Sequence, residues 1–83
     1  MTESAATIVV KAAFDTEAGV WYVKSSDLPG LNVEAPSVEA FTRQVELAAS
    51  DLIEASGSAH GRFDVPIEII AHASGRARGP AIA

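Results

Sequence analysis

The apolar residues between positions 38 and 55 are the feature that most limits how this chain can fold. They recur three and four residues apart, as on one side of an amphipathic helix: Val38, Phe41, Val45, Ala48, Ala49, Leu52 and Ile53. Ser37 is a residue type that caps helix N-termini, and Gly57 is placed to end a helix in a left-handed conformation. The spacing therefore predicts one helix, from about Val38 to Ala55.

The other apolar stretches alternate as β-strands do, at residues 7–14, 20–25, 31–35 and 65–72. Asp15 and Gly19 bound a hairpin loop, and Pro29-Gly30 fits the centre of a type II turn. Pro66 has no amide hydrogen and so belongs at the start or edge of the last strand. The order β-β-β-α-β predicts an α+β fold with a small antiparallel-type sheet and one helix on one face.

A single helix can cover only one face of a four-stranded sheet. Trp21 or Tyr22 must then lie on the other face, together with several of Val9, Ala13 and Ile70. A bare apolar sheet face usually becomes a contact surface. A chain of 83 residues buries only ~60–65% of its unfolded surface. It has no cysteines for disulfides, so we expect a homo-oligomer or another protein partner.

The charge balance bears on the class of partner. Eleven acidic residues against six basic ones give a net charge of -5. This argues against nucleic acid, whose phosphates need Lys and Arg, and is compatible with a basic protein. The apolar runs are too short to span a membrane, and residues 1–6 have no features of a signal peptide. A cytoplasmic location is expected by default.

The residues that could do chemistry are scattered through the expected elements. The candidate carboxylates for a metal site are Asp15, Asp27, Asp51, Glu54 and Glu68, and no expected strand carries an inward carboxylate at its centre. His60 lies in a loop and His72 ends the last strand, with no paired nucleophile. The sequence predicts no catalytic residue, metal or cofactor, and hence no enzyme.

Several motifs, taken in order, resemble the HicB-like family of antitoxin domains. They are residues 8–15, 19–23, 26–31 with Asp27-Leu28-Pro29-Gly30, 34–39 and 65–71. The chain resembles still more closely a short relative of that domain with no assigned function. The resemblance implies a partial RNase H-like fold. It also implies a partner of the HicA type, a small basic toxin that cleaves messenger RNA and that HicB proteins neutralise by covering its active site.

The chain differs from full HicB proteins after the last strand, where those carry a DNA-binding segment. Only about ten Gly-, Ala- and Arg-rich residues remain here, too few for a helix-turn-helix unit. Direct DNA binding is therefore not expected, although Arg76 and Arg78 could touch phosphate weakly. We divide the chain into a disordered N-terminus at 1–6, a HicB-like domain at 7–73 and a flexible tail at 74–83.

Two surfaces are candidates for partner binding. One is the uncovered sheet face, with an aromatic residue from Trp21 and Tyr22 as its anchor. The other is the exposed side of the helix, where carboxylates surround an apolar residue: Glu39, Glu46, Leu47 and Glu54. The expected function is that of an antitoxin-like protein that occludes a HicA-type toxin. The alternative is an orphan homodimeric interaction module with no toxin partner.

Overall fold

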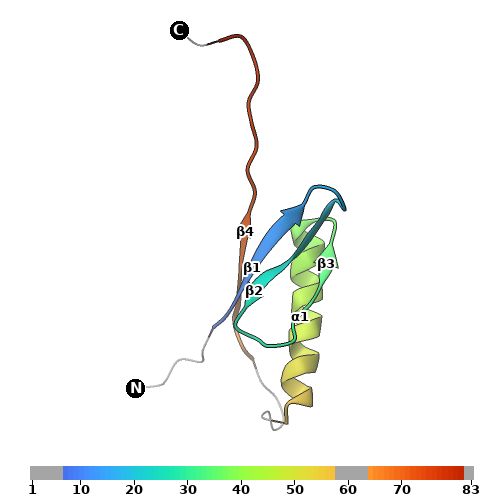
Figure 1. Ribbon diagram of the computed structural model, residues 1–83. Helices are drawn as coiled ribbons and strands as arrows, with labels where there is room; N and C mark the ends of the chain where they lie inside the picture. The colour runs from blue at the N-terminus through green and yellow to red at the C-terminus, as the bar shows by residue number, and fades with distance from the viewer. Residues whose placement is uncertain (1–6, 58–63, 82–83) are drawn as a thin grey trace, which may run out of the picture.

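The computed structural model describes residues 7–57 and 64–81, which form a sheet of four strands with one helix packed on one face (Figure 1). This confirms the predicted α+β fold with β-β-β-α-β order. The elements in chain order are β1 (Ile8–Asp15), β2 (Val20–Ser26), β3 (Glu34–Ala35), α1 (Val38–Ala55) and β4 (Ile67–His72).

The strands lie in the order β3-β2-β1-β4, and the sheet is mixed rather than wholly antiparallel. β2 is antiparallel to both β1 and β3, whereas β4 pairs with β1 in parallel. The helix explains why β4 runs parallel to β1. Its 18 residues carry the chain back over about 27 Å. The next strand therefore begins at the end where β3 began and runs parallel to β3 and β1.

Local side-chain and backbone contacts hold both predicted turns. Asp15 Oδ1 accepts hydrogen bonds from the amides of Glu17 and Ala18 at 2.9 and 3.2 Å, and Gly19 closes this hairpin loop with φ +71°. In the second turn Gly30 has φ +87°, and the Leu31 amide donates to the Leu28 carbonyl at 3.4 Å. These are the features of a type II turn with Pro29 and Gly30 at its centre.

The helix begins and ends where the sequence predicts. The Ser37 hydroxyl accepts a hydrogen bond from the Ala40 amide at 3.1 Å, which satisfies one of the free amides of the first turn. Beyond the last turn, Gly57 adopts φ +74°. The residues of α1 that are fully buried against the sheet are Phe41, Val45 and Ala49.

The third strand is shorter than predicted. Of residues 31–35, only Glu34 and Ala35 pair with β2, opposite Tyr22 and Trp21. Leu31 follows the turn directly and is buried at 7% exposure, so it packs into the core instead of continuing the ladder. The alternation of apolar and polar residues in this stretch therefore reflects inward packing more than strand pairing.

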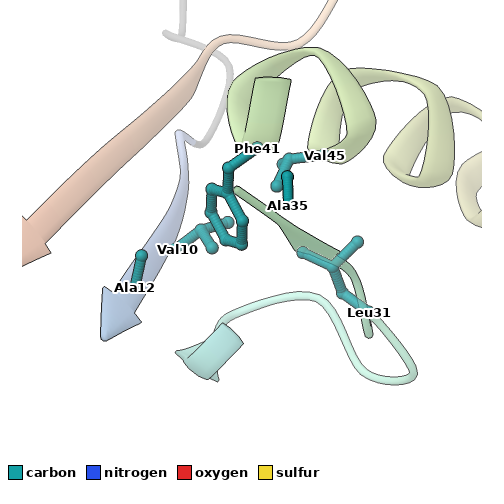
Figure 2. Packing of buried hydrophobic residues seen from close by; sticks show 6 residues of the cluster. All are labelled: Val10, Ala12, Leu31, Ala35, Phe41 and Val45. Carbon is teal, nitrogen blue, oxygen red and sulfur yellow. The ribbon is translucent and has the colours of Figure 1, made fainter. Parts of the chain in front are cut away.

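The core lies between α1 and the sheet (Figure 2). The Phe41 ring extends from the helix toward Val10 on β1, and both residues have 0% exposure, as does Val45. Ala12, Leu31 and Ala35 complete the cluster. Several half-buried residues pack around it, among them Trp21, whose ring also lies 5.2 Å from that of Phe14, centroid to centroid.

Candidate protein-binding surfaces

The strand register shows which residues lie on the sheet face opposite the helix. Val10 and Ala12 are buried under α1, so their neighbours in β1 project from the other side. Residues directly opposite one another in adjacent strands share a face. Tyr22 therefore lies between Ala13 and Glu34, and His72 lies on the other side of Ala13.

This open face is less apolar than the sequence predicts. Tyr22 and Ile70 are its large exposed apolar residues, at 37% and 44% exposure, and Val9 and Ala13 are half-buried. Exposed polar side chains interrupt them: Lys11, Glu34, Glu68 and His72. The expectation of a broad bare apolar face therefore needs correction, because alternation brings charged residues of β1, β3 and β4 to this side.

The two aromatic residues predicted as anchors lie on different sides of the sheet. Trp21 pairs with Phe14 and with buried Ala35, which places it on the helix side, where it packs against the core. Tyr22 projects from the open face. Of the six residues predicted to bind a partner, Trp21 is thus part of the folded core region, Tyr22 lies on the open face, and the other four lie on α1.

We use the name acidic helix face for the side of α1 that carries Glu39, Glu46, Leu47 and Glu54. All four residues are exposed, and Leu47, at 62%, has the largest exposure of the large apolar residues within 7–57 and 64–81. At ~100° per residue they all point away from the Phe41–Val45 side of the helix, together with Arg43. The structure therefore brings these four predicted residues together on one surface.

A hollow of about 270 Å³ adjoins this surface, between α1 and the start of β4. It has carboxylates and apolar side chains together in its lining: Glu46, Ala49, Ser50, Ile53, Asp64, Val65 and Ile67. Asp64 was not among the residues singled out from the sequence. No local pattern marks it, because only the packing of the chain around the start of β4 on the helix brings it to the same hollow as Glu46.

The carboxylates considered for metal binding are spread over the molecule. Asp15 and Asp27 accept backbone hydrogen bonds at opposite ends of β1, where Asp27 Oδ2 lies 3.0 Å from the Val9 amide nitrogen. Asp51 and Glu54 are on the outside of α1 and Glu68 is on the open face. Among residues 7–57 and 64–81, no three His, Cys, Asp or Glu side chains are grouped as a metal site.

Two further features concern the histidines and membranes. His72 is exposed at the end of β4, whereas His60 lies outside the described residues. In the part of the chain that the structure describes, no helix has both the length and the apolar character required to cross a bilayer.

The folded elements lie between residues 8 and 72. The division at 1–6, 7–73 and 74–83 stays a prediction, and residues 1–6 are outside the described part.

Comparison with known proteins gives a family and a related structure. The crystal structure of a hypothetical protein, TTHA1013, from the extremely thermophilic bacterium Thermus thermophilus is similar to this chain. The TM-score is 0.63 and the sequence identity 32%, over 89% of this chain and 100% of that one. No curated protein matches the chain. A family model described as a domain of unknown function, DUF1902, matches residues 7–79. The chain therefore belongs to the DUF1902 family.

Proposed function

We propose that this domain works as an antitoxin-like protein, which binds a small basic protein of the HicA type and covers its RNA-cleaving site. The observation that carries the proposal is the acidic helix face, where Leu47 is 62% exposed among carboxylates. The motifs that resemble HicB, from the first strand to Asp27-Leu28-Pro29-Gly30 and the last strand, supply the class of partner.

Charge favours a basic partner at this surface. The chain has a net charge of -5. On the surface of α1, Glu39, Glu46 and Glu54 outnumber the one cation that the helix itself carries, Arg43. Complementary charges raise the rate of encounter and fix the orientation of docking more than they raise affinity. We therefore assign the recognition of a basic surface to these carboxylates.

Leu47 supplies the apolar contact that a complex also needs. A leucine buried completely contributes about 1.5–3 kcal/mol. Covering the exposed 62% of Leu47 would then contribute roughly 1–2 kcal/mol, which is about a tenfold change in affinity. The exposed leucine is thus large enough to matter for binding, whereas it contributes little to the folded domain alone.

The hollow beside the helix suits a lysine or arginine of the partner. Ala49, Ile53 and Val65 offer apolar contact to the aliphatic stem of such a side chain, and Glu46 and Asp64 offer carboxylates to its charged end. The volume of about 270 Å³ is ample for one side chain. In this proposal the domain performs no chemistry and inhibits by occupying the partner's surface.

The test is an RNA-cleavage assay with a small basic protein of the HicA type. The unaltered domain in excess should suppress cleavage. Leu47→Ala should raise the concentration needed about tenfold, and Glu54→Lys should raise it further. Glu17→Lys makes the same charge change in the hairpin loop, outside the acidic helix face, and should leave inhibition unchanged. Full cleavage in the presence of excess unaltered domain would refute the proposal.

A further inference from the structure

The outer edge of β4 has no partner strand among the described residues. β4 is the last strand of the sheet, and its register with β1 is regular from Ile67 to His72. Proteins usually protect such edges with lysine, proline or a bulge. The sequence Ile67-Glu68-Ile69-Ile70-Ala71-His72 contains no lysine or proline, and Glu68 is its one acidic residue. This edge is therefore open to pairing with another strand.

The chain beyond β4 continues as an extended segment away from the rest of the domain (Figure 1). Every residue from 73 to 81 is exposed. A Cβ atom added at Gly75 or Gly79 would meet nothing within 4 Å. The longest dimension of the molecule is accordingly 61 Å, against 33 and 18 Å for the other two. Because the family match extends to residue 79, this segment is part of the family's domain.

We infer that residues 67–79 of two copies of this chain pair as antiparallel strands about a twofold axis. Pro66 and Pro80, which have no amide donor, bound the segment. If every residue from 67 to 79 takes part, the centre of the pairing is Ala73. A twofold contact of this kind is self-complementary, so each copy supplies the same edge. The two sheets would then join into one across the β4 edges.

Charge complementarity selects a second copy as the occupant of this edge. If the extended backbone continues, Arg76 and Arg78 project from the same side as Glu68. Pairing about Ala73 places Glu68 directly opposite Arg78 of the partner subunit and diagonally beside Arg76 of the partner subunit. Opposite charges in these positions stabilise strand pairs. Residues 73–81 contain no acidic residue, so the attraction is not cancelled within the segment.

The same pairing covers apolar surface that α1 leaves exposed. Ile70 would lie opposite Arg76 of the partner subunit, whose aliphatic stem can cover it. Ile70 is 44% exposed in the single chain. Of the seven buried apolar residues in the described part of the chain, three are alanines, Ala12, Ala35 and Ala49, so this core is small. Self-association is a common way in which domains of this size gain stability.

The test is sedimentation equilibrium with a charge exchange. The unaltered chain should have twice the 8.6 kDa mass of one copy. Glu68→Arg should weaken dimerisation roughly tenfold, since it turns attraction into repulsion in both symmetric contacts. The triple variant Glu68→Arg/Arg76→Glu/Arg78→Glu should restore it. The control Asp51→Arg makes the same change of charge on the exposed outside of α1 and should remain dimeric.

A monomeric unaltered chain at all concentrations would overturn this inference, and so would a failure of the triple variant to recover. Circular dichroism checks that each variant keeps its helix. Binding of a different protein to this edge by a monomeric chain would likewise overturn it. The inference does not depend on the antitoxin proposal, because the acidic helix face lies on another side of the domain and is tested by RNA cleavage.

Discussion

Truncation to alanine should change the stability of the domain very differently at two positions of α1 that are two residues apart. Val45 has 0% exposure and lies in the core cluster, whereas Leu47 has 62% exposure and lies on the acidic helix face. We predict that Val45→Ala destabilises the domain strongly and that Leu47→Ala leaves its stability almost unchanged. Both substitutions are in α1, both introduce alanine, and both are measured by the same method.

The magnitudes follow from burial. Val45→Ala removes two buried methyl groups, at about 0.8 kcal/mol each, and leaves a cavity that the sheet and helix cannot fully close. The expected loss is roughly 2–3 kcal/mol. Leu47→Ala removes contacts that are mostly with water, and alanine favours helix slightly more than leucine does. The expected change is within about 0.5 kcal/mol.

The stability of both variants is measured by unfolding in urea. The unfolding is monitored by circular dichroism of the helix and by the fluorescence of Trp21. Protein concentration must be equal in all samples, since dimerisation would make the stability depend on it. With an m-value of about 1 kcal/mol/M, the midpoint of Val45→Ala should fall by about 2–3 M. An equal loss for Leu47→Ala would show that Leu47 is buried, and the assignment of the helix faces would then be wrong.

Substitutions at three further positions test local contacts. Ser37→Ala should cost about 1 kcal/mol of unfolding free energy and Ser37→Asp much less, measured by urea, because Ser37 caps α1; equal losses would contradict the capping role. Gly30→Ala should cost about 1 kcal/mol of unfolding free energy and Gly30→Asn less, because φ at this position is +87°. An added Cβ would meet only Leu52, at 3.6 Å, so the cost arises in the backbone. Thermal melts that do not change would contradict this. Asp27→Ala should cost about 1 kcal/mol and speed exchange of the Val9 amide, whereas Asp27→Asn should keep most of the stability.

The helix and turns could be predicted from the sequence because their signals are local. Ser37, the three- and four-residue spacing from Val38, and Gly57 lie next to the structure that they specify. Pro29 and Gly30 likewise determine their own turn. The length of β3 could not be predicted, because it depends on whether Leu31 pairs with β2 or packs inward, and the core of the whole domain decides that.

The candidate surfaces were predictable only in part. Helical geometry alone places Glu39, Glu46, Leu47 and Glu54 together. Trp21 and Tyr22 are adjacent in β2, so one must face the helix, but only the register with Ala35 and Ala13 shows which. The hollow that joins Glu46 to Asp64, and the parallel pairing that puts β4 at the edge, depend on contacts between distant segments.

Amide hydrogen exchange in residues 73–79 tests most directly the claim that this domain presents surface for another polypeptide to cover. Within one chain, the backbone amides of these residues have no hydrogen-bond partner among the described residues. If a second copy pairs with them, alternate amides from Ala73 to Gly79 should exchange slowly, and the protection should increase with protein concentration. Exchange of all amides after His72 at the rate of an unstructured peptide, at every concentration, would contradict the account.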